Sequence, residues 1–149
     1  MVVDASAVIA VLNYERRGSE IATALDVHLK NDGQVYMPPT AVFEAVIGLA
    51  RAGARPNKAN AGHIERACAV VRSFIAALSI KETQISSEVA AKALEAAARF
   101  GAAVGHPAGL NFGDCFAYAT AKAYRSPLLF IGDDFIRTDI ESVLANPSP

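Results

Sequence analysis

The residues of this 149-residue chain that could do chemistry together are acidic, and they lie far apart in the sequence. Each one follows a strand-like run or stands near the start of a helix-like segment. They are Asp4, Glu44, Asp114 and the adjacent pair Asp133 and Asp134. Since the carboxyl ends of parallel strands share one edge of a sheet, these side chains can converge there. No lysine or arginine stands directly beside Asp4, Glu44, Asp114 or Asp133 to neutralise it.

Converging carboxylates without basic partners repel one another and raise each other's pKa. A divalent cation resolves that conflict. Because the donors are oxygens only, they favour Mg²⁺ or Mn²⁺ over zinc, which prefers His or Cys. Such a cation suits phosphate chemistry, since one or two metals can activate water and stabilise charge on the departing oxygen. The acids therefore predict a metal site that acts on phosphates.

Each acid also has an ordinary structural interpretation. Asp4 or Ser6 could cap a helix, since both residue types favour that position. Asp114 could be an acid favoured by the dipole of a helix start, and Asp133 could be a turn residue. Glu44 could be solvated on a helix surface. The order and setting of all the acids, rather than any one of them, favour the metal site.

Strands and helices alternate along the chain, which favours a central parallel sheet covered on both faces in a single α/β domain. Strand-like runs lie at residues 2–3, 35–37, around 78–80 and at 128–131. Helical patterns follow at about 5–12, 20–30, 40–52, 64–78, 83–100 and 111–124. Thr40 could cap or open the third helix, and Thr138 with Glu141 matches a capping box for a last helix. We expect the domain to span residues 1–145, with a short tail at 146–149.

The composition excludes other classes of protein. A hydrophobic fraction of 52% with 19% charged residues fits a compact domain. The net charge of −1 gives no global nucleic-acid signature, so a polyanion must be held by a local basic patch or by metal ions. The sequence has no apolar run long enough to span a bilayer, which predicts a cytoplasmic protein without a membrane segment. Cys68 and Cys115 are interpreted as core residues, although a disulfide stays open.

The acids and their flanking residues resemble the PIN domain family, and within it the VapC-type toxins of bacterial toxin–antitoxin pairs. The resemblance extends over essentially the whole chain. It rests on Val3-Asp4-Ala5-Ser6-Ala7, on Pro39-Thr40-Ala41-Val42-Phe43-Glu44, on Asn111-Phe112-Gly113-Asp114-Cys115-Phe116-Ala117-Tyr118-Ala119, and on Leu129-Phe130-Ile131-Gly132-Asp133-Asp134-Phe135 with Arg137-Thr138-Asp139. The last two runs are the most specific. The Gly- and Ala-rich stretch 102–110 departs from the family and could reshape the rim where substrate enters.

The resemblance implies a PIN-like fold and a Mg²⁺- or Mn²⁺-dependent endoribonuclease toxin that hydrolyses RNA phosphodiester bonds with metal-activated water. It implies that the acids are the catalytic residues. Asp4 and Asp114 are then the principal metal ligands, and Glu44 with either Asp133 or Asp134 completes the set. It also implies a cognate antitoxin that occupies the active-site groove, and assembly as a homodimer or as a toxin–antitoxin hetero-oligomer.

Other residues are expected to support the site or to hold RNA. Ser6 matches a small hydroxyl residue that supports the acids in the family. The RNA backbone needs positive partners. Arg51, Arg55 and Lys58 cluster around the turn between the third and fourth helices and are candidates for that role, with a solvated face as the alternative.

Two rival functions come from other classes. One is a catalytically inactive PIN-like module that acts only through protein contacts, against which the complete acidic set argues. The other is a phosphatase that uses Asp4 as its nucleophile. Such enzymes typically carry a second Asp two residues further on, and Ser6 at that position counts against this rival.

Overall fold

The structure, a computed structural model, describes residues 1–144 and contains one four-stranded sheet in the order β3-β2-β1-β4. The strands are β1 (Val2–Val3), β2 (Tyr36–Met37), β3 (Lys81–Glu82) and β4 (Leu128–Leu129). Each neighbouring pair runs parallel, so all four carboxyl ends lie at one edge. The central strand β1 is therefore flanked by β2 and β4, and the residue after each strand starts from the same side of the sheet.

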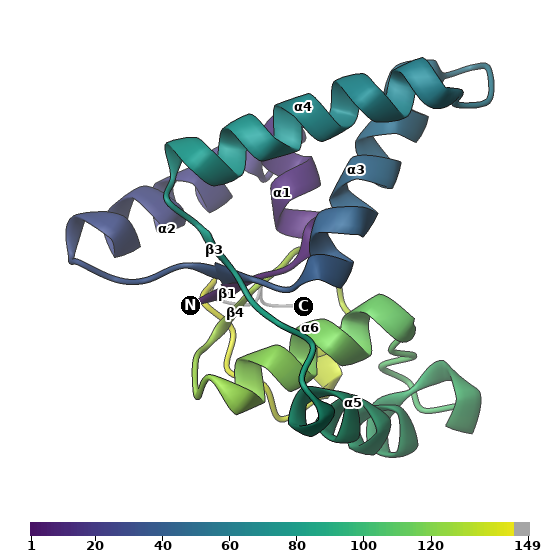
Figure 1. The fold of residues 1–149 in the computed structure, drawn as a ribbon. Coiled ribbons are helices and arrows are strands. Elements are labelled where there is room, and N and C mark those ends of the chain that lie inside the picture. The colour runs from purple at the N-terminus through teal and green to yellow at the C-terminus, as the bar shows by residue number, and fades with distance from the viewer. Residues whose placement is uncertain (145–149) are drawn as a thin grey trace.

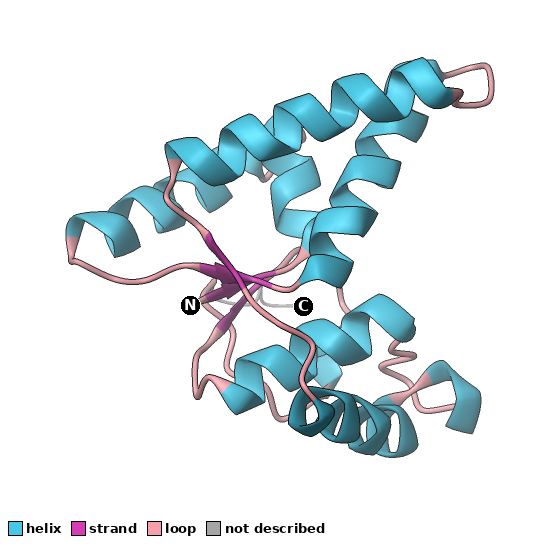
Figure 2. Cartoon of the chain, in the orientation of Figure 1, coloured by secondary structure: helices cyan, strands magenta, loops and turns pink. Residues whose placement is uncertain are grey.

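Helices cover both faces of the sheet, as Figures 1 and 2 show. One face carries α1 (Ala5–Leu12), α2 (Gly18–Lys30), α3 (Pro39–Ala54) and α4 (Ala61–Ala77). The other carries α5 (Ser87–Phe100) and α6 (Phe112–Ala123). Two short 3₁₀ helices, Ala102–Val104 and Phe135–Arg137, lie in the connecting segments. The predicted α/β fold with a parallel sheet covered on both faces is confirmed.

Two hydrophobic cores hold these layers together, one on each face of the sheet. Successive residues of a strand point to opposite faces. Val3 and Leu129 accordingly belong to the core beneath α1–α4, whereas Val2 and Leu128 belong to the core beneath α5 and α6. All four are fully buried. The apolar pair before Asp4 thus anchors that acid to both cores, which holds it at a rigid position.

The third strand and several helix starts differ from their predicted positions, the start of α5 by the most. The backbone N–H of Ile80 donates to the carbonyl of Ile75, so the chain is still closing α4 where a strand was expected, and β3 begins at Lys81. Helix α3 begins at Pro39 and Pro38 is its N-cap, so Thr40 is not a cap. Helix α5 begins at Ser87, later than the pattern predicted.

The last helix predicted from Thr138 is wrong. The Thr138 hydroxyl donates to the carbonyl of Phe135 at 2.7 Å, which closes a turn rather than capping a helix. Leu128 N–H then donates to the carbonyl of Glu141 at 2.8 Å, and Val143 N–H donates to the carbonyl of Leu128 at 3.0 Å. Residues 141–143 therefore run beside β4, because backbone pairing at that open sheet edge outcompetes a short helix. The predicted tail 146–149 lies outside the described residues.

Two further expectations concern membranes and disulfides. Among residues 1–144, no helix has the length and apolar character needed to cross a membrane. Cys115 of α6 is buried in the core between the sheet and α5 and α6, and Cys68 of α4 is half-buried against the other core. Both thiols are free, so the disulfide that the sequence left open is not formed.

Candidate functional site

Asp4 lies where β1 ends and α1 begins, and only 5% of its surface is exposed. It is the N-cap of α1, and its Oδ2 accepts hydrogen bonds from the Ser6 backbone N–H at 2.9 Å and from the Ser6 hydroxyl at 2.5 Å. The same hydroxyl accepts from the Ile131 N–H at 3.0 Å. Asp4 is therefore the cap, and Ser6 ties its carboxylate to the chain that leaves β4.

Glu44 lies in the second turn of α3 and faces the start of α6. A Cβ placed on Gly113 would lie 2.1 Å from Glu44 Oε2 and 2.3 Å from its carboxyl carbon, far inside van der Waals contact. Only a residue without a side chain lets the carboxylate approach this closely. The first turn of a helix also attracts negative charge. Gly113 thus makes the space in which Glu44 sits.

Asp114 forms a capping box with Asn111 at the start of α6. The Asn111 Oδ1 accepts from the Asp114 N–H at 3.1 Å, and the Asp114 Oδ2 accepts from the Asn111 N–H at 2.8 Å. The structural interpretation of this acid is therefore confirmed. The capping role of Asp114 does not compete with a ligand role, because the capping bond uses one carboxylate oxygen and fixes the direction of the other.

Asp133 and Asp134 follow β4 in an exposed turn. Gly132, which leads into the turn, has φ +116°, a conformation that other residues rarely adopt. The two acids differ in their electrostatic effect on the site. Asp134 raises the pKa of Asp4 and of Asp114, whereas Asp133 is not among the charges that perturb either of them. Asp134 is thus the acid that this turn brings to the others.

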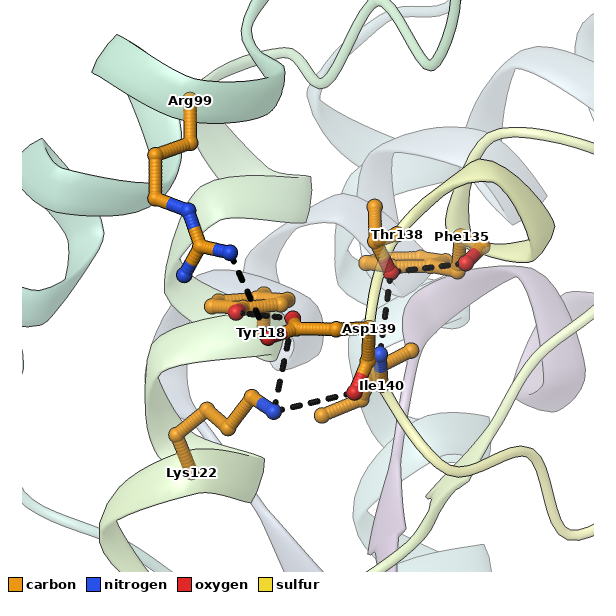
Figure 3. A network of polar contacts seen from close by, with 7 residues as sticks. All are labelled: Arg99, Tyr118, Lys122, Phe135, Thr138, Asp139 and Ile140. Atoms are coloured by element: carbon orange, nitrogen blue, oxygen red, sulfur yellow. Dashed lines mark hydrogen bonds and ion pairs between the residues drawn. The ribbon is translucent and has the colours of Figure 1, made fainter.

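A polar network holds the segment that follows this turn, as Figure 3 shows. Asp139 Oδ1 accepts from the Tyr118 hydroxyl at 2.5 Å, and Oδ2 lies 3.4 Å from an Arg99 nitrogen. Lys122 Nζ lies 3.4 Å from Oδ1 and donates to the Asp139 carbonyl at 3.0 Å. The hydrogen bond from Tyr118 is the largest cause that lowers the pKa of Asp139. Helices α5 and α6 thereby fix the chain just beyond Asp134.

The acids share one electrostatic environment. Burial raises the pKa of Asp4, against the opposing hydrogen bonds from Ser6. Burial, then the charges of Asp4 and Asp114, raises the pKa of Glu44 to about 7. Burial also raises the pKa of Asp114 to about 6, with Asp4 and Asp134 adding to it. Three acids from separate elements therefore have raised pKa values at the carboxyl edge of the sheet, and the charge of Asp134 adds to the effect on two of them.

The donor set fits a hard divalent cation. Every candidate ligand is a carboxylate oxygen, and no basic side chain is among the groups that perturb the pKa of Asp4, Glu44 or Asp114. Within residues 1–144, however, no three acidic, histidine or cysteine side chains are already gathered around one point as metal ligands are. Mutual repulsion between uncompensated carboxylates opposes such an arrangement until a cation offsets it.

The structure does not bring the predicted basic residues to the acids. Arg51, Arg55 and Lys58 are exposed around the turn that joins α3 to α4, at the outer end of these helices in Figure 1. At 1.5 Å per residue along α3, Arg55 lies about 16 Å beyond Glu44. These side chains are therefore not partners of the carboxylates.

Two features of the site were not predicted from the sequence. Gly113 has a local signal, because glycine within a helix costs up to about 1 kcal/mol relative to alanine and so indicates a close approach. The contact between Tyr118 and Asp139 had no local signal, since the two residues belong to different elements and meet only in the folded chain.

Comparison with known proteins places this chain among similar sequences over most of its length. Residues 1–141 match the family model of the PIN domain. A VapC ribonuclease of Rhizobium meliloti is 42% identical over 141 residues, which cover 93% of this chain and 97% of the relative. The ribonuclease VapC36 of Mycobacterium tuberculosis is 33% identical over 141 residues, covering 95% of this chain and 91% of the relative.

A solved structure has a similar fold. The crystal structure of VapC20 of Mycobacterium tuberculosis, a toxin that cleaves the sarcin-ricin loop, superposes with a TM-score of 0.64. The match covers 93% of this chain and 95% of that chain, at 14% sequence identity. At that identity the similarity concerns the fold.

Proposed function

This chain belongs to the PIN domain family and, within it, to the VapC ribonucleases, and we propose that it is a Mg²⁺- or Mn²⁺-dependent endoribonuclease that hydrolyses RNA phosphodiester bonds. The family assignment confirms the resemblance inferred from the sequence. The proposal for this chain's own chemistry rests chiefly on one observation: Asp4, Glu44 and Asp114 meet at one site where the charges of Asp4, Asp114 and Asp134 raise the pKa of neighbouring acids and no basic side chain is among the groups that shift them.

We assign a separate task to each of these side chains. Asp4 and Asp114 would hold the cation, because their capping bonds at Oδ2 fix both carboxylates on rigid helix starts. Glu44 and Asp134 would complete the oxygen set. A bound divalent cation supplies a more acidic water and offsets charge that develops on the phosphate. Ser6 holds the Asp4 carboxylate, and Asp133 is left outside the set.

The proposal is tested by incubating the purified protein with total RNA and by sequencing the 5′ ends of the fragments. Cleavage at defined positions is expected with Mg²⁺ or Mn²⁺, and none is expected in EDTA. Cleavage that persists unchanged in EDTA would contradict the metal dependence. A protein that cuts no RNA and gives no heat when titrated with Mg²⁺ or Mn²⁺ would instead be the inactive interaction module.

The stability of the metal-free protein is expected to fall as pH rises from about 5 to 8. The pKa of Glu44 is 4.5 in the reference state and about 7 in the fold. Between these values the folded state binds more protons than the unfolded state, so the free energy of unfolding decreases with pH. The variant Glu44→Gln should therefore melt several degrees above the wild type at pH 8 in EDTA.

Measuring both proteins at pH 5 and with saturating Mg²⁺ provides the control. At pH 5 the folded wild type carries Glu44 largely protonated, so the two melting temperatures should nearly coincide. At pH 8, Mg²⁺ should raise the melting temperature of the wild type more than that of Glu44→Gln, because only the wild type offers the full carboxylate set. A difference in melting temperature that is the same at both pH values would rule out titration of Glu44 as its source.

Replacing Ser6 by alanine should weaken metal binding and cleavage indirectly, through the Asp4 carboxylate that Ser6 holds. The variant loses the hydroxyl that donates to Asp4 Oδ2 and leaves the Ile131 N–H without its acceptor. Removing such a supporting contact typically costs about tenfold to a hundredfold in activity or metal affinity. We expect Ser6→Ala to need a higher Mg²⁺ concentration for cleavage than the wild type. Ser6→Thr keeps a hydroxyl and should restore the wild-type Mg²⁺ dependence. Equal Mg²⁺ dependence in Ser6→Ala and the wild type would show that the hydroxyl is only structural.

Partners and location are part of the same proposal. We infer that a cognate antitoxin silences the enzyme by covering the acidic site, and that the chain forms a homodimer or a toxin–antitoxin hetero-oligomer. A cytoplasmic site of action follows from an RNA substrate. Arg51, Arg55 and Lys58 stay candidates for phosphate contacts further along the RNA, because none of them is among the groups that shift the pKa of Asp4, Glu44 or Asp114.

A further inference from the structure

A small recess opens beside the acidic site between the start of α3, the segment before α5 and the start of α6. Its volume is about 300 Å³. It is lined by Pro39, Thr40, Phe43, Glu44, Ile85 and Phe112. The lining is therefore apolar apart from one hydroxyl and one carboxylate, and that carboxylate is a member of the acidic set.

Two phenylalanines of this recess are unusually exposed. Phe43 is 66% exposed and Phe112 is 73% exposed. Large aromatic side chains normally bury most of their surface, so a pair of exposed rings at one recess is a sign of binding rather than of folding. Phe112 is also held in place, because its ring packs on that of Phe116 with centroids 4.8 Å apart. The rings are thus presented to solvent on rigid helix starts.

The chain connects each ring directly to an acid of the site. Phe43 immediately precedes Glu44 in α3, and Phe112 stands two residues before Asp114 in α6. The Glu44 carboxylate in turn lies against the backbone of Gly113. Because Glu44 itself lines the recess, a molecule bound at the acids has the recess directly beside it.

We propose that this recess holds a nucleobase of single-stranded RNA next to the scissile phosphate, stacked on Phe43 and Phe112; this inference rests on the ribonuclease function proposed above. A phosphate does not suit the recess, because its lining contains a carboxylate and no cation. A base has the opposite character, with a π face that stacks on aromatic rings and little net charge. Unpaired bases are the ones available for such stacking, so the substrate is unpaired at this position.

The variants Phe43→Leu and Phe112→Leu test the proposal because they keep apolar bulk but remove the aromatic face. Each should lower kcat/KM for the mapped RNA substrate about tenfold, the scale of one lost base–aromatic stack. The variants Phe43→Tyr and Phe112→Tyr retain the ring and should cleave at the wild-type rate. Tyr14→Leu is the matched control, because Tyr14 is an aromatic residue 94% exposed outside the recess. It should leave kcat/KM unchanged.

A substrate that lacks one base next to the cleaved bond completes a double-mutant cycle. The wild type should cut this abasic RNA about as slowly as the leucine variants cut normal RNA, and the leucine variants should lose nothing further on it. Leucine variants that match the wild type on normal RNA would overturn the inference. It would also be overturned if the loss from the leucine change and the loss from the missing base multiply when the leucine variants act on abasic RNA. Reduced cleavage that follows a change of molecular mass in light scattering would assign the recess to a second copy of the chain and also overturn it.

Failure of the underlying ribonuclease function gives a different result. In that case the wild type cuts no RNA with Mg²⁺ or Mn²⁺, which overturns both the ribonuclease function and the stacking inference that rests on it. Where the wild type cuts RNA and the leucine variants cut it equally well, the ribonuclease function stands and the stacking role is wrong.

Discussion

The variant Asp4→Asn is expected to lose RNA cleavage by about a thousandfold, the scale of removing a principal electrostatic group from an active site. Asp4 is buried at the centre of the acidic set and perturbs the pKa of both Glu44 and Asp114. Asparagine removes the charge but keeps an oxygen that can accept from Ser6, and it is as good an N-cap as aspartate. The fold should therefore survive the substitution.

Three measurements on Asp4→Asn separate chemistry from folding. Thermal unfolding in EDTA at pH 8 should give a melting temperature at or above that of the wild type, because one repelling charge is gone. Calorimetric titration with Mg²⁺ or Mn²⁺ should show binding to the wild type and little or none to the variant. Glu65→Gln, which neutralises an exposed acid of α4, is the matched control and should cleave like the wild type. Full cleavage by a folded Asp4→Asn protein would refute the proposed site.

The variant Gly113→Ala is expected to reduce cleavage about a hundredfold although it changes no acid and no polar group. The new Cβ would lie 2.1–2.3 Å from the carboxyl atoms of Glu44, so that flexible side chain must move away. A displacement of about 1 Å at a reacting centre can cost roughly a hundredfold in rate. Alanine is a better helix former than glycine, by up to about 1 kcal/mol, so the melting temperature should not fall.

Gly53→Ala is the matched control, because a Cβ at that helical glycine of α3 meets nothing within 4 Å. It should be neutral or stabilising and leave cleavage unchanged. Combining Gly113→Ala with Glu44→Gln tests the mechanism directly. Since both changes act on the same carboxylate, the double variant should cleave no more slowly than Glu44→Gln alone. Losses that multiply in the double variant would show that Gly113 acts through another group.

Much of the fold could be predicted because its causes are local. Val2-Val3 before Asp4 predicts a buried strand followed by a helix, and the capping pair of Asn111 and Asp114 predicts where α6 begins. Alternation of such units implies parallel strands, and parallel strands bring their carboxyl ends to one edge. The order of the acids along the chain was therefore enough to predict that they meet, to infer an oxygen-only site and to recognise the family.

Tertiary contacts decided the features that have no local cause. Thr138 and Glu141 form a capping-box pattern, yet the open edge of β4 pairs with residues 141–143 and no helix forms there. Asp133 and Asp134 are equivalent in sequence, and only the conformation of the turn after Gly132 brings Asp134 to the other acids.

The Glu44 carboxylate has its place because Gly113, which is 69 residues away in the sequence, leaves room for it. The sequence by itself predicted which groups could act and at which sheet edge they lie, since strand direction and helix starts depend on neighbouring residues. The folded chain decided which acids raise one another's pKa, because that depends on packing between elements distant in the sequence.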